Sequence, residues 1–194
     1  MKTTRNLLRV LLLSSLLAAP LARAQDPGFY VGAAAGQSSY REICRDFDSI
    51  VGASGAFDCQ TREATGGKLF AGWRLHRNLA LELSYFDFGK ARTTGTVSGA
   101  QAEGTMTTKA AGLSAVGLLP VTEDLWIFGR LGGLQTQTRS TLNGAGLASR
   151  DETEIHTGIG GLWQLSRRWA ARLEYERSSD IKIDFISLGV QLGF

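Results

Sequence analysis

The chain has 194 residues, of which 24 are glycine and only three are proline, and its formal net charge is +3. Four of the 21 basic residues and none of the 18 acidic ones lie in the first 24 positions. Without that segment the net charge is −1, so the composition gives no support to nucleic-acid binding. The other residues, about 170, suit one domain, and many glycines with few prolines favour strands and turns over long helices.

The N-terminal segment has the three parts of a secretory signal peptide. Lys2, Arg5 and Arg9 are basic, an apolar run follows over residues 7–19, and an Ala-Arg-Ala tripeptide ends at residue 24. We predict that residues 1–24 are a cleaved signal peptide and that residues 25–194 form the mature domain. A transmembrane anchor is the alternative, but the run is shorter than the roughly 20 residues with which a helix crosses a bilayer.

Two cysteines, Cys44 and Cys59, lie in one polar stretch of this exported chain. A disulfide between them is expected in an oxidising compartment, where it would stabilise the fold by roughly 3 kcal/mol. A pair of free thiols is the alternative. The same stretch contains Asp46, Asp48 and Asp58, but their spacing matches no calcium loop, so a solvated acidic loop is the preferred interpretation.

Apolar and polar residues alternate along the mature chain, which is typical of strands with one apolar face. The pattern is clear at residues 79–85, 154–165, 169–176 and 184–194. Four further candidates, residues 29–39, 65–75, 105–118 and 125–137, alternate less clearly. In the last of them an inward Arg130 also turns Trp126 and Phe128 inward, so the phase of that strand stays open. The sequence therefore predicts eight strands.

The links between these strands alternate in length. Short links at residues 75–78, 119–124 and 166–167 alternate with longer polar ones at 40–64, 88–104 and 138–151, and the final link at 178–183 is shorter. Short turns at one end and long loops at the other are typical of outer-membrane barrels, whose short turns face the periplasm.

The second face of the strands carries too many charges for the dry core of a soluble sandwich or lipocalin-like barrel. We assign to it Lys68, Arg74, Glu82, Arg130, Glu154, His156, Arg172, Glu174 and Glu176. Lipid outside and a polar lumen inside fit this pattern better. The predicted fold class is an all-β, antiparallel, eight-stranded transmembrane β-barrel.

All four tryptophans, Trp73, Trp126, Trp163 and Trp169, lie beside the short turns. We expect one aromatic girdle there, at the periplasmic interface, with Tyr85, Tyr175 and Phe185 supplying a second girdle at the other. The alternative is that aromatic residues simply favour strands.

Several of these segments resemble the OmpA-like transmembrane domain of Gram-negative outer-membrane proteins. The resemblance rests on Gly-Phe-Tyr-Val-Gly at 28–32 and on the segments 68–74 and 78–89, and it covers essentially the whole mature chain. It implies an outer-membrane barrel in contact with lipid and lipopolysaccharide, and Phe194 looks like the terminal signal that the barrel-assembly machinery reads. Members include structural proteins, adhesins and serum-resistance proteins. Since the chain ends at the last strand, peptidoglycan anchoring is not implied.

The inward charges allow two interpretations, a proton-relay or catalytic site and a set of ion pairs that fills the barrel. The second is preferred, because eight-stranded barrels have lumens just wide enough for side chains. His156 with Glu154 supplies a base and an acid but no nucleophile, so no enzyme is expected. His76 and His156 are far apart, and neither a metal nor another cofactor is expected.

Three function classes remain at this point: a structural or adhesive barrel, a narrow channel gated by the charges, and an outer-membrane lipid-modifying enzyme. The first is preferred. Residues 40–64 are the predicted contact with a host or cell-surface ligand, because this loop is the longest and is exposed.

Overall fold

The computed structural model describes residues 28–40, 55–58, 63–97, 100–179 and 182–194. The strands are β1 (Gly28–Tyr40), β2 (Gly55–Asp58), β3 (Glu63–His76), β4 (Leu79–Val97), β5 (Ala100–Pro120), β6 (Leu125–Leu142), β7 (Ala145–Gln164), β8 (Trp169–Ser178) and β9 (Ile183–Gly193). No helix in the described ranges is long and apolar enough to cross a membrane. The predicted signal peptide and disulfide, as well as Asp46 and Asp48, lie outside the described residues.

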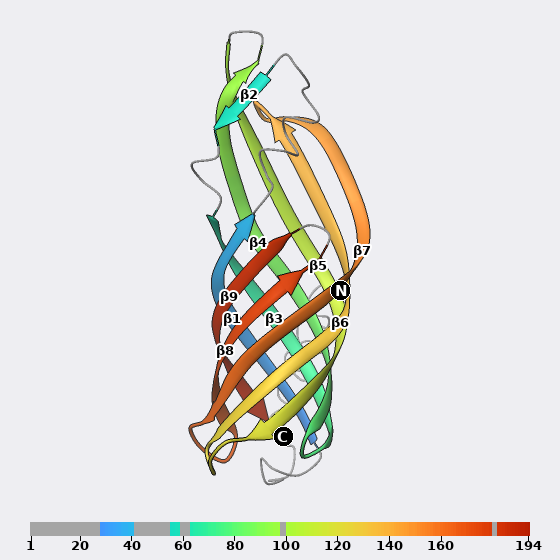
Figure 1. Cartoon of the computed structure of the whole chain (residues 1–194), viewed down its shortest axis with the longest axis vertical. Helices are drawn as coiled ribbons and strands as arrows, with labels where there is room; N and C mark the ends of the chain where they lie inside the picture. The colour runs from blue at the N-terminus through green and yellow to red at the C-terminus, as the bar shows by residue number, and fades with distance from the viewer. Residues whose placement is uncertain (1–27, 41–54, 59–62, 98–99, 180–181) are drawn as a thin grey trace, which may run out of the picture.

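Eight of the strands close into a ring, as the sequence predicts (Figure 1). β1 pairs with both β3 and β9, and β4 closes the other side by pairing with β5. Every pairing is antiparallel, and the even strand number brings the first and last strands side by side. The backbone of the closed ring leaves no sheet edge within the membrane, where an unpaired amide would be costly.

The barrel has charged side chains inside and large apolar side chains outside, the reverse of a soluble protein. Residues along β8 alternate between exposed and buried, and its buried positions carry Arg172, Glu174 and Glu176. Many outward positions of the barrel carry large apolar side chains, and several of these are 59–65% exposed: Leu69, Leu83, Leu113, Leu119, Leu131, Ile155, Ile159, Trp163 and Leu188. Only a lipid environment makes this arrangement favourable.

The short predicted links are turns at the end of the barrel that carries the C-terminus (Figure 1). Side chains fix them. Asn78 donates to the Leu118 carbonyl at 2.8 Å, and the Thr122 hydroxyl accepts the Leu125 amide at 3.0 Å. Ser166 accepts the Trp169 amide at 3.2 Å in the third turn.

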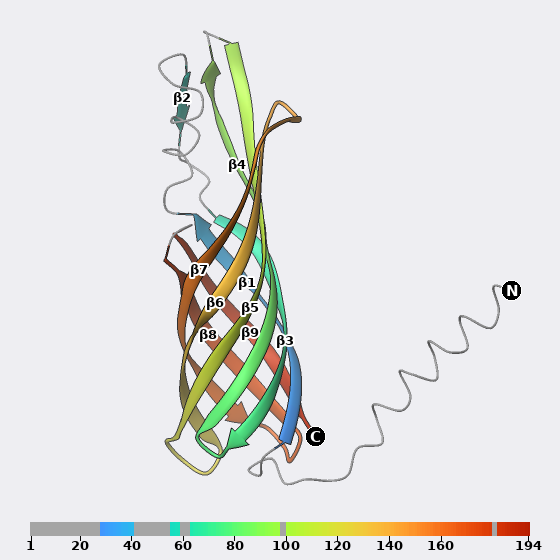
Figure 2. The same ribbon diagram turned by 90° about the vertical axis from the view of Figure 1, so that its right-hand side faces the viewer.

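Two of the long predicted links are not loops, and this is a correction. β4, β5, β6 and β7 have 19, 21, 18 and 20 residues, whereas the other barrel strands have 10 to 14. The β4–β5 ladder continues to the pair Val97–Ala100 and the β6–β7 ladder to Leu142–Ala145. Residues 88–104 and 138–151 are therefore largely strand, and they project beyond the barrel rim (Figures 1 and 2).

Local backbone features explain where these projecting strands start and end. β4 has a bulge between Asp87 and Lys90, and there Gly89 has φ +80° and donates its amide to Asp87. A Cβ at this glycine would overlap the Thr65 carbonyl. At the other end, Asn143 and Gly144 have φ of 50° and 80°, as a two-residue type I′ hairpin requires.

A ninth strand, which the sequence does not predict, lies within the expected first loop. β2 pairs with residues 94–97 of β4, beyond the barrel. This ladder connects the segment between β1 and β3 to the projecting β4–β5 hairpin (Figure 2).

Candidate functional site: the charged lumen and the projecting strands

The lumen has a charged centre formed by six side chains from four strands. β3 provides Lys68, β4 provides Glu82 and β6 provides Arg130, whereas β8 provides three at alternate positions. All six are at most 4% exposed. The members of this lumen cluster are Lys68, Glu82, Arg130, Arg172, Glu174 and Glu176.

Glu82 lies between the cations. One carboxylate oxygen accepts from Arg130 Nη2 at 2.5 Å, and the other accepts from Arg172 Nη1 at 2.8 Å and from the Tyr30 hydroxyl at 2.9 Å. Lys68 Nζ lies 3.7 Å from the first oxygen. A carboxylate with this many partners repays its desolvation through charge-assisted hydrogen bonds.

The other two carboxylates complete the balance. Lys68 donates to Glu174 at 3.0 Å and to Glu176 at 2.9 Å. Arg130 forms ion pairs with the same two residues at 3.1 and 2.8 Å, and Arg172 Nε lies 2.7 Å from Glu174. Three cations thus face three anions, and the lumen cluster is neutral as a whole.

Aromatic and aliphatic side chains close the lumen on both sides of the charges. The Arg172 guanidinium lies 4.4 Å from the Phe70 ring centroid and 4.5 Å from that of Phe128, and Lys68 Nζ lies 5.2 Å from Phe70 and from Phe86. Toward the short turns, the first apolar cluster comprises Tyr30, Phe70, Ala80, Val116, Leu118, Trp126, Phe128, Leu162 and Ala170. Toward the projecting strands, the second comprises Tyr40, Ala64, Phe86, Phe88, Ala91, Ala110, Leu134, Ile183 and Phe185. The barrel is therefore filled, in the manner of a small barrel rather than a wide pore.

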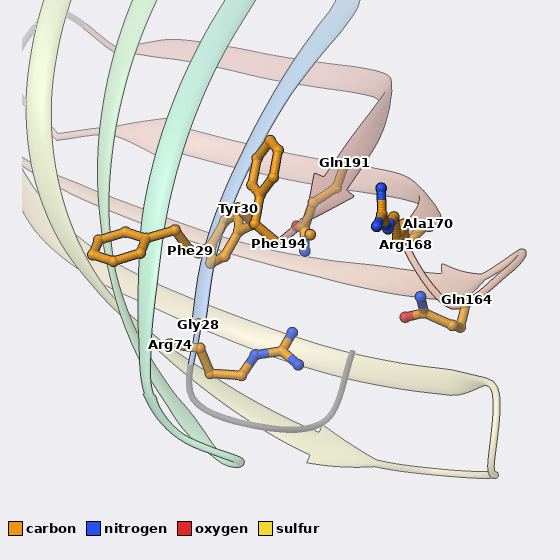
Figure 3. Close-up of a pocket in the computed structure, with 10 residues that line it drawn as sticks. Gly28, Phe29, Tyr30, Arg74, Gln164, Arg168, Ala170, Gln191 and Phe194 are labelled. Atoms are coloured by element: carbon orange, nitrogen blue, oxygen red, sulfur yellow. The ribbon is translucent and has the colours of Figure 1, made fainter. Parts of the chain in front are cut away.

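Three predicted lumen residues lie outside the central cluster. His156 Nε2 is 3.3 Å from Glu176, and its ring meets Phe86 edge-on at 5.4 Å. Glu154 is buried and accepts a hydrogen bond from Ser178. Arg74 lies at the end with the short turns, where it lines a small cavity with Arg168 and Gln191 (Figure 3). At about 30 Å³ this cavity has room for one or two waters, which is too little for a substrate.

Sequence reasoning missed two partners of the charges, Tyr30 and Gln191. The Tyr30 hydroxyl donates to Glu82, and Gln191 accepts from Arg172 at 3.3 Å. Both occupy the inward phase of their strands, so the alternation around Phe29 and Leu192 contained the signal.

The tryptophans do not all share one side of the wall. Trp73, Trp163 and Trp169 are 48–60% exposed beside the short turns, and Phe29 stacks on Trp73 with ring centroids 5.8 Å apart. Trp126 is only 5% exposed and packs in the first apolar cluster, so its place in the outward girdle was wrong.

The physical reason is that Arg130 sets the phase of β6. Its guanidinium must reach the three carboxylates, which turns Trp126 and Phe128 inward with it. Gly158 and Gly160 of β7 leave the room that Arg130 and Phe128 occupy. At the other end Tyr85 and Tyr175 are exposed, whereas Phe185 is buried in the second apolar cluster and is not a girdle residue.

A serine lies beside the two residues that suggested a base and an acid. Ser178 is the cross-strand partner of His156, but its hydroxyl donates to Glu154, and no hydrogen bond joins it to His156. Both residues are 2% exposed, so no substrate reaches them. In the described ranges no group of three His, Cys, Asp or Glu side chains is placed to hold a metal ion.

The projecting strands present a firm polar surface. The Asn143 backbone amide donates to the Glu103 carbonyl, and the Asn143 side chain accepts the Glu103 amide, both at 2.8 Å. The tip of the β6–β7 hairpin is thereby attached to β5. Among the described residues of these strands, exposed polar or charged side chains include Arg92, Thr94, Gln101 and Arg139.

Comparison with known proteins identifies the architecture. The model of the OmpA-like transmembrane domain matches residues 24–184. Outer membrane protein A of Serratia marcescens is 29% identical over 164 residues; these cover 81% of this chain but only 44% of that protein's length.

Solved structures agree on the fold. The N-terminal β-barrel domain of Pseudomonas aeruginosa OprF superposes with a TM-score of 0.60 at 13% identity, covering 87% of this chain and all of that one. The attachment invasion locus protein Ail of Yersinia pestis gives a TM-score of 0.55 at 17% identity, again over 87% of this chain and all of that one.

Proposed function

Since the chain belongs to the family of OmpA-like transmembrane domains, we propose that it is a membrane scaffold that holds a contact surface outside the cell. It is an outer-membrane β-barrel. In this proposal residues 1–24 are removed on export, the barrel-assembly machinery recognises the C-terminal strand with Phe194, and the projecting strands and outer loops contact a host or cell-surface ligand. No catalysis is expected.

The observation that carries the proposal is the difference in strand length. The 21 residues of β5 rise by about 55 Å if each adds about 3.4 Å and the strand tilts by about 40°. The lipid-facing band of such a barrel is about 25 Å tall. Roughly half of β5 is therefore more than membrane crossing requires, and long structured projections are where binding residues concentrate.

A second observation connects the predicted contact loop to the projection. Residues 40–64 contain β2, whose ladder with β4 lies on the projecting hairpin. β2, which lies between Cys44 and Cys59 in the sequence, thus belongs to the same surface as the β4–β5 hairpin.

Loop replacement tests the proposal in bacteria that express the full chain. One variant joins Arg92 to Thr105 through Asn-Gly, and a second replaces residues 40–64 with a short turn. Attachment to epithelial monolayers and to cells of the same strain should fall for both variants. In detergent electrophoresis, boiled and unboiled samples of each variant should still differ in mobility, which shows that the barrel is folded. The matched control changes the short turns at the far end, R77Q/R167Q, and should attach normally. Attachment that survives both replacements would leave a purely structural role.

A narrow channel is the second candidate, because the lumen contains charges that an inert scaffold does not need. The filled lumen allows only small conductance, gated by movement of the lumen cluster. Planar bilayers with purified protein test this candidate. Glu82→Ala and Arg130→Ala should each change the conductance, and an unchanged current in both would remove the channel. The mass spectrum of lipid A from expressing cells tests the least favoured class, a lipid-modifying enzyme.

A further inference from the structure

A group of cations lies on the outside of the barrel wall, on three neighbouring strands. Lys90 and Arg92 are on β4, Lys109 on β5 and Arg139 on β6, and all four are exposed. The register places Lys90, Thr107 and Arg139 in one row, with Lys109 and Arg92 one step below and above it. The basic patch below means the four cations Lys90, Arg92, Lys109 and Arg139.

The direction of these side chains follows from their neighbours. Ala91 is fully buried, and its register partner Met106 packs against the second apolar cluster, so both point into the barrel. Lys90 and Arg92 flank Ala91 and therefore point outward. Arg139 likewise follows Thr138, whose hydroxyl bonds to Thr108 on the inner side.

The height of the patch coincides with the edge of the apolar band. Along β5 the outward positions run from Leu119 through Leu113 to Lys109, a distance of ten residue steps. Ten tilted residues rise by about 25 Å, which is the height of the lipid-facing band. Lys109 thus lies at the level where acyl chains give way to headgroups, and the other three cations lie just above it.

The charge of this sector is positive after its anions are counted. Asp87 lies 3.6 Å from Lys109, and Glu103 lies 3.8 Å from Arg92, with all four side chains about half exposed or more. Such exposed pairs are weak and exchange readily. Lys90 and Arg139 have no ion-pair partner within the described ranges. Asp151, beside Gln137 on β7, borders the patch.

The rest of the rim differs from this sector. On β8 and β9 the outward Arg177 pairs with Asp184 at 3.5 Å, and the outward end of β3 carries Glu63. In the described part of the chain, the outward cations above the apolar band therefore concentrate on β4, β5 and β6.

We propose that the basic patch binds the phosphate groups of a phosphorylated glycolipid in the outer leaflet, whose acyl chains lie on the apolar wall below. Arg and Lys donate charge-assisted hydrogen bonds to phosphate, and Thr107 and Gln137 beside them offer partners for sugar hydroxyls. The exposed Tyr85 and Leu113 lie on the wall below Lys90 and Lys109, and the exposed Leu131 lies farther down β6, below Gln135 and Gln137. This apolar wall favours a lipid headgroup over a soluble phosphate. This proposal does not depend on attachment to another cell.

Binding of purified, folded protein to lipid A tests it, with bisphosphorylated lipid A, its dephosphorylated form and inorganic pyrophosphate as probes in detergent micelles. K90Q/R139Q removes the two patch cations that have no ion-pair partner among the described residues. It should weaken binding of bisphosphorylated lipid A by about thirtyfold, since each surface cation contributes about 1 kcal/mol to binding anionic lipid. R77Q/R167Q removes the same charge from exposed turns at the other end and should bind like the parent. K90R/R139K keeps the charge and should also bind normally. For each variant, a change in electrophoretic mobility on boiling verifies that the barrel is folded.

Three outcomes would overturn the proposal. The first is equal affinity of K90Q/R139Q and R77Q/R167Q for bisphosphorylated lipid A. The second is equal binding of the dephosphorylated lipid by the parent, which would make the interaction purely apolar. The third is competition by pyrophosphate at the concentration at which lipid A itself binds, which would assign the patch to a soluble anion.

Discussion

Replacing Glu82 with glutamine removes one negative charge from the lumen and almost no volume. Lys68, Arg130 and Arg172 would then face only Glu174 and Glu176, so the lumen cluster would carry one unbalanced positive charge. Removing one partner of a buried ion pair typically destabilises a protein by about 3–5 kcal/mol. We expect E82Q to lose that amount of unfolding free energy, measured by urea titration of tryptophan fluorescence in lipid vesicles.

Two further variants separate this effect from ordinary surface charge. Glu103 pairs with Arg92 at 3.8 Å in solvent, so E103Q should lose less than about 1 kcal/mol. E82Q/R172M restores the charge balance and keeps an apolar group between the Phe70 and Phe128 rings, so it should recover part of the loss. If E82Q and E103Q were equally stable, the lumen charges would be hydrated rather than paired, and the account of a closed neutral lumen would fail.

Three other predictions concern single positions. Brominated lipids should quench the fluorescence of a variant that retains only Trp163 and leave a variant that retains only Trp126 bright, because the first side chain faces lipid and the second faces the lumen. In detergent electrophoresis of unboiled samples, a reductant should lower the mobility of the parent but not that of Cys44→Ser, if Cys44 and Cys59 form the proposed disulfide. Gly144→Val should cost about 1–2 kcal/mol at its positive φ and speed amide exchange at the β6–β7 tip, whereas a flexible loop there would show no change.

The inward charges were predictable because the alternation within one strand determines the face. On β8, Arg172, Glu174 and Glu176 share a phase opposite Leu173 and Tyr175, and the structure buries all three. Which cation meets which carboxylate was not predictable, since the partners lie up to 108 residues apart in the chain. Their pairing depends on how far each strand is displaced along its neighbour when the ring closes.

The phase of β6 depends on residues outside β6. Residues 125–137 have apolar side chains or glycines on both faces, so neither face of the segment stands out. Arg130 resolves the choice through carboxylates of β4 and β8, and the glycines of β7 make it sterically possible. The position of Trp126 followed from these contacts.

The projecting strands were missed for a different reason. Alternation is a signal of contrast between lipid and lumen, and above the rim the outward face of a strand meets water instead of lipid. Runs without large apolar side chains, such as residues 100–104, therefore look like loops, although their backbone ladder with β4 continues. The Asn143-Gly144 pair was the available signal, because this dipeptide favours the turn that joins two long antiparallel strands.

The basic patch and the projection occupy the same sector of the barrel, and this coincidence has a mechanical consequence. Lys90 and Arg139 lie on the strands that continue into the projecting hairpins, at the point where those strands leave the membrane. β8 and β9 end near this level, so the projecting β7 loses its β8 neighbour above the pair His156–Ser178. Lipid phosphates bound to the patch would hold the base of the projection from the outside, where no strand does. The orientation of the proposed contact surface would then depend on the lipid of the outer leaflet as well as on the barrel.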